Sequence, residues 1–351
     1  MARGRSLLAY AVARAALAIP MLLILLTAVF FILRVLPGDP VLALWGGREP
    51  PPEVVEAARV QLGLDKPPWI QYLDYMSRFF RGDFGISIGE FYHGRPVIGE
   101  IANRLPATVE LSIGSMLVAS SVGILTGIVG GARRDTKTDV AVRLYGTIIY
   151  VIPIFWLGVL FQIVFAIWLG WLPPHGRWQG SVYPQGLLLE GRRYTTGMYT
   201  VDSLLEGNLD HFWNAVRHLV LPCLTLGLVL SGFFTKTVRA NMLRTMMADY
   251  TEAARARGVP ERQVVTKHAF KNALVPVVTL LGLQFAILFA GAVLTEKTFS
   301  IEGIGLLLLQ SVISKDMTMI QGVVIIYAAI IVVISLVIDI LGAVIDPRIR
   351  L

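Results

Sequence analysis

Long apolar runs alternate with shorter polar segments along this chain. Six runs reach the length that a membrane-spanning helix needs, and they lie at about 8–35, 107–131, 144–171, 219–235, 274–295 and 318–345. A helix requires roughly 20 consecutive apolar residues to cross the core of a bilayer, and the runs lack the alternation of β-barrel strands. The pattern therefore predicts an all-α membrane protein with six transmembrane helices. The fourth run is the shortest and contains Pro222, so its ends are the least defined.

The polar segments divide the chain into parts with different expected locations. These parts are the N-terminus and first helix at 1–36, an extracytoplasmic segment at 37–106, helices two and three at 107–171, an extracytoplasmic insertion at 172–217, and helices four to six at 218–351 with a cytoplasmic loop at 237–272. The cluster Leu36-Pro-Gly-Asp-Pro40 should end the first helix as it leaves the membrane. The apolar run at 8–35 is much longer than the core of a secretion signal, so we expect it to remain as a membrane helix.

Lys and Arg are concentrated in alternate polar segments. The segments 1–15, 132–144, 236–272 and 346–351 contain 17 of the 31 Lys and Arg residues but only 6 of the 24 Asp and Glu residues. Basic residues are enriched on the cytoplasmic side of membrane proteins. The charge pattern therefore predicts that both termini and the loop at 237–272 are cytoplasmic.

The overall composition supports the same class. With 55% hydrophobic and only 16% charged residues, the chain is too apolar for an ordinary water-soluble domain. Its net charge of +7 follows from membrane topology, which makes nucleic-acid binding a poor explanation. Cys223 is the only cysteine, which excludes an intrachain disulfide and a cysteine-cluster metal site. Its apolar neighbours predict a small core residue.

A polar stretch between the fourth and fifth runs has the features of a short helix. Asp249 followed three residues later by Glu252 predicts an N-cap with a capping-box partner, so the helix should start at Tyr250. Gly258 supplies a left-handed position after the last turn, and Pro260 prevents the helix from continuing. A helix of about two turns is too short to be stable alone in water. We therefore expect flanking membrane helices or a partner to hold it.

The side chains of this helix leave two interpretations open. Ala253, Ala254 and Ala256 would let one side lie close against another surface, and Arg255 and Arg257 add charge. Short motifs are weak signals, so local chemistry fits either a docking helix or an ordinary solvated loop helix.

The stretch Glu252-Ala253-Ala254, followed by Gly258, resembles the "EAA" loop of ATP-binding-cassette (ABC) importer permeases. In that family the loop docks into a cytoplasmic ATPase subunit. The commonest form has Ile-x-Leu-Pro shortly after the glycine, whereas the tail here, His-Ala-Phe-Lys-Asn-Ala-Leu-Val-Pro at 268–276, resembles the peptide/nickel branch. The resemblance implies that the ATPase contact is made by Tyr250, Glu252, Ala253, Ala254, Arg255, Arg257 and Gly258.

Other segments resemble the same family in the expected order. Leu62-Gly-Leu-Asp-Lys-Pro67 and Arg81-Gly-Asp-Phe-Gly-Ile-Ser87 resemble stretches that follow the first helix of peptide and nickel permeases, with Phe84 in place of the usual Leu. The segment 296–305 resembles the family's Glu-x-x-Phe-x-x-x-Gly-x-Gly stretch, and 346–350 resembles its C-terminus. The aromatic residues near 69–84 also fit a small structural cap on the outer membrane surface. Only about 172–215 matches poorly.

This resemblance implies a permease subunit of an ABC importer of the oligopeptide/dipeptide/nickel group, in the plasma membrane of a prokaryote. Di- and oligopeptides are the expected cargo, with oligosaccharides or nickel as alternatives. The chain lacks a phosphate-binding loop and even one Gly-Lys dipeptide, so no cofactor is expected and ATP would be bound and hydrolysed by partner subunits. The implied partners are a second, similar permease, two ABC ATPases, an extracytoplasmic substrate-binding protein and the lipid bilayer, without nucleic acid.

Two other classes of function remain as rivals. An ion-coupled secondary transporter would need buried charges or internal repeats near the membrane midplane, and Asp339 is the main isolated candidate. A membrane-bound enzyme ranks last, because no His-Glu-x-x-His or comparable catalytic cluster appears and no catalytic residue can be assigned.

Two further polar residues lie in or near predicted helices. Glu110 could cap the second helix, pair with Arg104 or face a water-filled path, and capping is the preferred interpretation. Gln284 could bond across helices or line a pathway. Substrate-binding residues stay unassigned.

Three histidines fall in or beside the 172–217 insertion, namely His175, His211 and His218. Imidazoles bind nickel, but the spacing is loose and no carboxylate completes a ligand pattern. Surface histidines are therefore the preferred interpretation, and no metal site is expected.

Overall fold

The computed structural model describes residues 7–34, 51–61, 63–189 and 192–345. In chain order its elements are α1 (Leu7–Arg34), α3 (Pro52–Gln61), α4 (Pro68–Phe80), α5 (Val97–Ala132), α6 (Lys137–Val151), α7 (Ile154–Phe161), the π-helix η1 (Gln162–Trp168), β1 (Leu187–Leu189), β2 (Arg192–Tyr194), α8 (Tyr199–Leu205), α9 (Leu209–Met246), α10 (Asp249–Ala256), α11 (Glu261–Gln263), the π-helix η2 (Val264–Ala269), α12 (Phe270–Gly291), α13 (Val293–Phe299), α14 (Ile304–Ile313) and α15 (Met317–Ile345). The predicted breaker at 36–40 and the motif at 346–350 lie outside the described residues.

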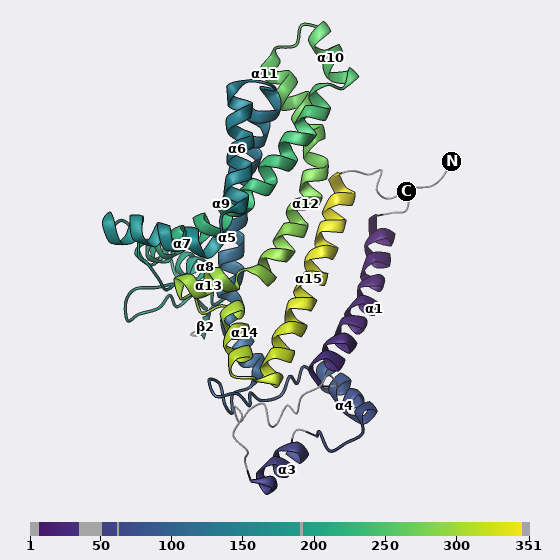
Figure 1. Ribbon diagram of the computed structural model, residues 1–351, viewed down its shortest axis with the longest axis vertical. Helices are drawn as coiled ribbons and strands as arrows, with labels where there is room; N and C mark the ends of the chain where they lie inside the picture. The colour runs from purple at the N-terminus through teal and green to yellow at the C-terminus, as the bar shows by residue number, and fades with distance from the viewer. Residues whose placement is uncertain (1–6, 35–50, 62, 190–191, 346–351) are drawn as a thin grey trace.

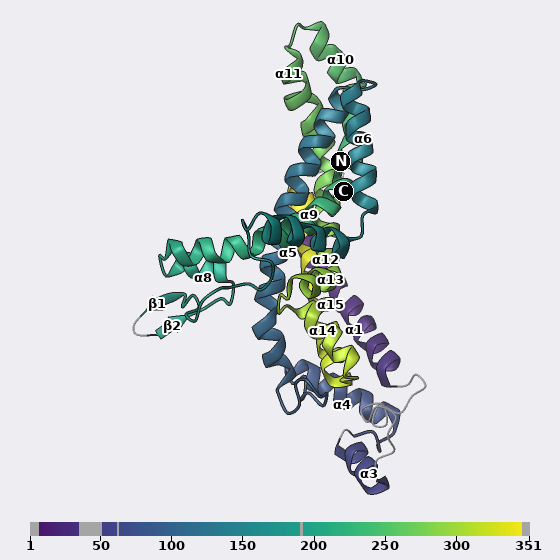
Figure 2. The ribbon, with the colours of Figure 1, turned by 60° about the vertical axis from the view of Figure 1, so that its left-hand side comes forward.

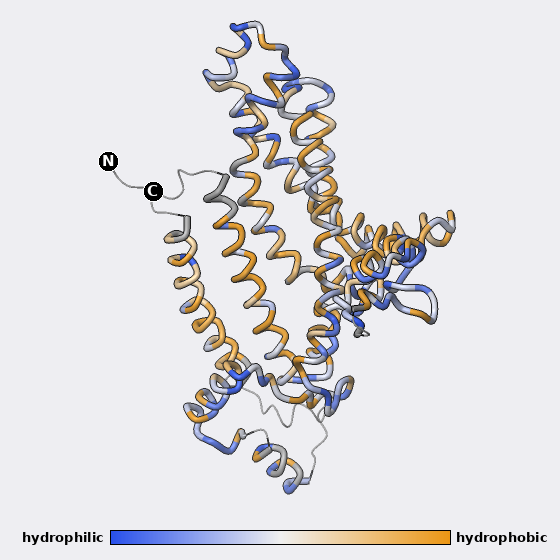
Figure 3. The backbone as a smooth tube through the Cα atoms, turned by 180° about the vertical axis from the view of Figure 1, so that it is seen from behind, coloured by the Kyte–Doolittle hydropathy of each residue, from blue (hydrophilic) through white to orange (hydrophobic). Residues whose placement is uncertain are grey.

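The helices form an elongated assembly with α10 and α11 at one end and α3 and α4 at the other (Figure 1). The backbone between these ends is mostly apolar, and polar residues gather towards the ends (Figure 3). Among the described residues, four helices are long and apolar enough to cross a membrane, and the number is six if each of two bent helix pairs forms one span. The predicted all-α membrane architecture is confirmed.

The helices α5 and α9 form the central pair. Glycines at every fourth position of α5 face large residues at every fourth position of α9, and the pairs are Gly123 with Phe234, Gly127 with Val238, and Gly131 with Met242. A Cβ atom on any of these glycines would lie only 2.3–2.5 Å from the Cβ of its partner. Small residues allow membrane helices to approach closely. The glycine row therefore sets the close packing of the two longest helices.

The third predicted span, at 144–171, is not one straight helix. α6 begins earlier, at Lys137, and the α6 and α7–η1 helices meet at an angle of 99°. Pro153 lies at the break, where it precedes α7, and Ile152 before it is extended. A proline lacks the backbone N–H that would continue the helix, and it disfavours helical geometry in the preceding residue. The sequence contained this signal, but the apolar run continued through it.

The second and fourth helices start earlier than predicted. α5 begins at Val97, ten residues before 107, and Pro106 lies inside it. α9 begins at Leu209 instead of 219, and the side chain of Asn208 caps it by accepting hydrogen bonds from the N–H groups of Asp210 and His211. Asn is among the best N-cap residues. The hydrophobic pattern marked the apolar part of each helix and missed the polar turns that precede it.

The end near α3 and α4 is held by aromatic contacts, as the sequence predicted. Phe30 of α1 packs against Tyr72 and Tyr75 of α4, with ring centroids 5.3 and 5.5 Å apart. The loop after α4 is tied to α15 because the Ser87 hydroxyl donates to the buried carboxylate of Asp316. That carboxylate also caps α15 by accepting from the Met319 N–H.

A lateral arm leaves the assembly at a steep angle (Figure 2). It comprises α7, η1, the β1–β2 hairpin, α8 and the start of α9, and we define it as residues 154–221 with 190 and 191 undescribed. The two strands pair antiparallel, with Leu188 opposite Arg193. The arm thus contains the whole insertion that the sequence could not assign.

Candidate functional site

The helix α10 forms the predicted docking segment, although its start differs from the prediction. It spans Asp249–Ala256 and its N-cap is Ala248, which has no capping side chain. Asp249 is therefore inside the first turn, and the predicted capping box with Glu252 is wrong. The anchor is instead Thr251, whose buried hydroxyl donates to the carbonyl of Thr245 at 2.7 Å. Carboxylates in the first turn still favour the positive end of the helix dipole.

The C-terminal end of α10 confirms the predicted role of Gly258. Its φ angle is +76°, in the left-handed region that favours glycine. The N–H of Val259 donates to the carbonyl of Ala254, and the N–H of Gly258 donates to that of Arg255. These bonds satisfy carbonyl groups that would be left open at the helix end.

The seven predicted coupling residues fall on two sides of the helix. Six are exposed, namely Tyr250, Glu252, Ala253, Arg255, Arg257 and Gly258. Ala254 is fully buried against its own chain, so it supports the helix and offers no contact surface. Arg255 forms a double ion pair with Glu261, with distances of 2.9 and 3.1 Å. This pair ties α10 to the segment that follows it.

Beneath α10 lies an apolar cluster that joins three membrane helices. Its buried members are Val238, Met242, Ala269, Ala273 and Val277, and we call it the α10 seat. Ile124 and Ile128 of α5 pack against it, while α10 itself contacts η2 and α9. A displacement of α10 would therefore disturb the packing among α5, α9 and α12.

On the same end, a buried ion pair links α6 to α9. Asp139 is fully buried and accepts two bonds from the guanidinium of Arg239, one of them at 2.8 Å. Arg143, one turn along α6, lies 3.7 Å from the same carboxylate. The pair is costly to break on the Asp139 side, because the buried carboxylate would lose its two bonds from Arg239.

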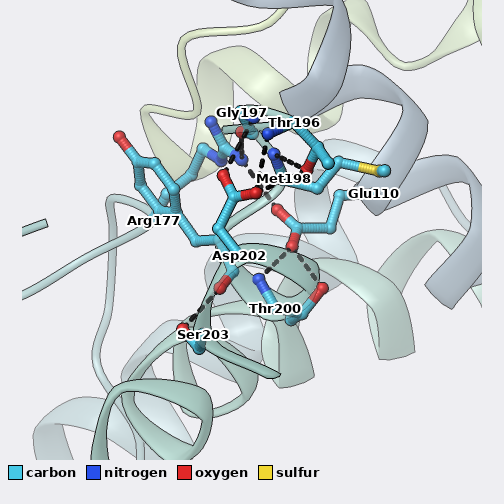
Figure 4. A network of polar contacts seen from close by, with 9 residues as sticks. Glu110, Arg177, Thr196, Gly197, Met198, Thr200, Asp202 and Ser203 are labelled. Atoms are coloured by element: carbon cyan, nitrogen blue, oxygen red, sulfur yellow. Dashed lines mark hydrogen bonds and ion pairs between the residues drawn. The ribbon is translucent and has the colours of Figure 1, made fainter. Parts of the chain in front are cut away.

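A second polar network fixes the lateral arm to α5 (Figure 4). Glu110 accepts from Arg177 at 2.7 Å and from the N–H and hydroxyl of Thr200. Because Thr200 lies in the first turn of α8, Glu110 caps that helix, whereas the sequence suggested capping of its own helix. The Arg177 guanidinium also lies 4.1 Å from the ring centroid of Tyr199. The alternative partner Arg104 pairs with Glu100 instead.

Sequence reasoning missed a fully buried carboxylate that joins two parts of the fold, Glu296. It has no exposed surface and accepts hydrogen bonds from the hydroxyl of Thr108 at 2.6 Å and from the N–H of Leu306 at 2.7 Å. A Cβ atom at Gly303 would lie 2.3 Å from its Oε1. The Glu-x-x-Phe-x-x-x-Gly-x-Gly stretch therefore places a carboxylate under the N-terminus of α14, against α5. The spacing of Glu and Gly was visible in the sequence, but the buried partner on α5 was not.

The remaining polar candidates have separate positions. Asp339 of α15 pairs with Arg14 of α1 at 2.7 Å, so it faces a helix partner. Among the described residues no group of three or more His, Cys, Asp or Glu side chains could hold a metal ion. His211 contacts Glu206, and Nδ1 of His218 contacts the carbonyl of Asn214.

Comparison with known proteins gives matches along almost the whole chain. Residues 123–351 match the family described as "Binding-protein-dependent transport system inner membrane component", and residues 7–112 match the N-terminal part described for such components. The dipeptide transport system permease protein DppB of Alkalihalophilus pseudofirmus is 36% identical over 344 residues, which is 98% of this chain and 100% of the relative.

Two further relatives have related names. The di/tripeptide transport system permease protein DppB of Pseudomonas aeruginosa is 36% identical over 98% of this chain and 99% of its own length. The probable D,D-dipeptide transport system permease protein DdpB of Escherichia coli is 39% identical over 91% of both chains.

Proposed function

The chain belongs to the binding-protein-dependent transport system inner membrane components and is an ABC importer permease of the peptide family, and from this we propose that it carries di- and oligopeptides across the plasma membrane of a prokaryote. It is a multi-pass membrane subunit that works with other transporter components. The named cargo of the relatives supports peptides over oligosaccharides or nickel for this chain.

The observation that carries the proposed mechanism is the placement of α10. Its exposed side presents Tyr250, Glu252, Ala253 and Arg257 beyond the end of the bundle, while its buried side rests near the α10 seat. When a partner protein bound to the exposed side of α10 moves, it would carry α10 along. The packed seat would then bias α5, α9 and α12 between inward-open and outward-open arrangements, which is the two-state element that alternating access requires.

Energy would come from partner subunits, because the chain has no phosphate-binding loop. The proposed assembly contains a second, similar permease, two ABC ATPases next to α10 and a substrate-binding protein at the α3–α4 end. The basic segments favour a cytoplasmic location for both termini and for α10. In this arrangement the permease itself carries out no chemical step and binds no cofactor.

The rival secondary transporter has less support. Its main candidate, Asp339, is engaged by Arg14 of the neighbouring helix at 2.7 Å. A charge that is neutralised by a fixed partner holds helices together, and it is a poor proton or ion carrier unless that pair opens.

Calorimetry on the cognate extracytoplasmic binding protein tests the cargo. We expect tight binding of di- or tripeptides and no heat with oligosaccharides or nickel. Sugar binding without any response to peptides would keep the importer architecture and overturn the peptide assignment.

A further inference from the structure

We propose that the lateral arm packs against the second permease subunit at membrane depth. The contact surface is the side of α9 that carries Leu209, Trp213 and Arg217, together with the β1–β2 hairpin. This inference rests on the proposed function, because the second permease is part of the assembly proposed above.

The level at which the arm leaves the bundle is the first observation. A Cβ atom on Gly322, near the start of α15, would lie 2.4 Å from the side chain of Val97, so α5 and α15 start side by side. Both helices run towards the α10 end (Figure 1). Glu110, which bonds to the arm, lies 13 residues after Val97, a rise of roughly 20 Å. The same rise from Gly322 ends within the apolar span of α15, which continues to Ile340.

The arm therefore leaves the bundle at membrane depth, and it extends sideways from there in both views (Figures 1 and 2). Between η1 and α8 its described residues form loops and a two-stranded sheet. Each strand of such a sheet has one unpaired edge. Lipid cannot satisfy open backbone groups, so loops and sheet edges at this depth lie against protein or beside a water-filled cavity.

The exposed charges of the arm are the second observation. Arg193, Asp210 and Arg217 are all exposed. Charged side chains within a membrane face a protein partner or a water-filled cavity, because lipid solvates them poorly. Lipid alone therefore does not cover the arm.

The apolar side chains beside these charges are the third observation. Leu209 and Trp213 are 65% and 59% exposed, and they lie with Arg217 on one side of α9 because the three are spaced four residues apart. Trp213 and Arg217 also line a hollow of about 390 Å³ together with Asp210. Aromatic residues and Arg are enriched where proteins meet, and a contiguous exposed apolar patch marks a binding surface. The face thus suits a protein that offers both apolar and polar side chains.

The second permease is the partner whose position matches this face. In the proposed assembly the ATPases lie next to α10 and the substrate-binding protein lies at the α3–α4 end, on opposite sides of the membrane. The arm lies between these two levels. A second membrane subunit can cover its apolar side chains, its charges and its strand edges at the same depth.

Photo-crosslinking in the assembled transporter, held in lipid nanodiscs, tests the contact. The photoreactive residue is introduced as Trp213→p-benzoylphenylalanine, with Leu209→p-benzoylphenylalanine as a second site if the first variant does not assemble. Phe212→p-benzoylphenylalanine is the matched control, because Phe212 is half-buried and points about 100° away on the same helix. Each variant is irradiated after the second permease and the ATPases have copurified with it, and the adducts are identified by mass spectrometry.

We expect light-dependent adducts with the second permease from positions 213 and 209 and none from position 212. Adducts with lipid alone, adducts with the binding protein or the ATPases, or no adduct at all would each overturn the proposal. ATP-dependent peptide uptake by the same preparation would then show that the proposed function still stands. If an active transporter contains no second permease, the proposed assembly is wrong and this inference fails with it.

Discussion

Gly258 ends α10 in a backbone conformation that most residues avoid. Its φ of +76° is combined with open space, because no atom lies within 4 Å of the position a Cβ would take. A substitution there is therefore strained without causing a clash. This separates the conformational requirement of the turn from any packing requirement, so a substitution at this position tests how the end of α10 affects function.

We predict that Gly258→Val lowers transport while the protein still inserts and folds. The left-handed conformation costs a non-glycine residue roughly 1–2 kcal/mol, which corresponds to a factor of roughly 5–30 if it falls on the docking-competent state. Gly258→Asn is the matched control, because Asn tolerates this conformation. ATP-dependent peptide uptake measures both variants, and equal uptake by the two would count against the assigned role of the turn.

Glu296 is a buried carboxylate that connects two helices, because it accepts hydrogen bonds from Thr108 of α5 and from Leu306 of α14. Burial raises the pKa of Glu296 to about 7, although the bonds from Thr108 and from the backbone of Leu306 oppose that rise. A carboxyl with a higher pKa in the folded state binds its proton more tightly there than in the unfolded chain. Folding stability should therefore be lost as the pH rises from the ordinary value of about 4.5 through 7.

We predict that Glu296→Gln removes part of this pH dependence. The thermal unfolding midpoint of the wild-type protein in detergent should fall more between about pH 5 and pH 8 than that of Glu296→Gln, because only the wild type must bury a charge at the higher pH. Glu296→Ala should be destabilised at every pH by about 1–3 kcal/mol, since it leaves buried donors unpaired. Parallel pH profiles of the wild type and the Gln variant would contradict this account.

At the scale of elements, the row of glycines between α5 and α9 decides how the two longest helices pack. The facing residues Phe234, Val238 and Met242 fill the space that side chains on α5 would need. Extra volume in a close-packed contact typically costs about 1–3 kcal/mol. Gly99, near the start of the same helix, has only Pro96 within reach, at 3.9 Å from the position that a Cβ would take.

We predict that Gly127→Leu destabilises the protein by at least the roughly 1–3 kcal/mol typical of overpacking, whereas Gly99→Ala is neutral or stabilising because alanine favours helix. Thermal unfolding of both variants in the same detergent measures the difference. If Gly127→Leu unfolds at the wild-type temperature, the contact between α5 and α9 is looser than the structure indicates.

The sequence predicted the elements where one signal dominated. Apolar length located the membrane helices, and Gly258 with Pro260 located the end of α10. It failed where two signals competed: the apolar run through Pro153 hid a right-angle bend, and Asp249 looked like a cap although Ala248 holds that position. The cap failed because the helix begins one residue earlier, where the backbone of the preceding turn and Thr251 fix its entry.

At the scale of the whole molecule, α5 and α9 connect the α10 end to the rest of the fold. The α10 seat contacts both helices, and Asp139 with Arg239 fixes α6 to the same end. The lower part of α5 carries Thr108 and Glu110, which hold α14 and the lateral arm. A change at α10 therefore has a continuous packed route to the opposite end, of the kind through which coupling between distant sites can travel.

The sequence did not reveal which residues that are distant along the chain contact each other in the fold. The family resemblance identified an ABC importer permease, and the comparisons confirmed it. The pairings of Glu110 with Arg177 and of Glu296 with Thr108 join residues 67 and 188 positions apart, and no local pattern encodes such contacts. The insertion at 172–217 stayed unassigned for the same reason, because Arg177 and Thr200 bond to Glu110 of the distant helix α5.

Uptake of a labelled dipeptide into proteoliposomes is the most direct test of the central claim. The vesicles contain this chain with its partner subunits and binding protein, and ATP is supplied on the side of the ATPases. We predict uptake that requires ATP hydrolysis, survives ionophores that collapse ion gradients, and falls with Gly258→Val. Uptake driven by an ion gradient without ATP would contradict the account and would favour a secondary transporter.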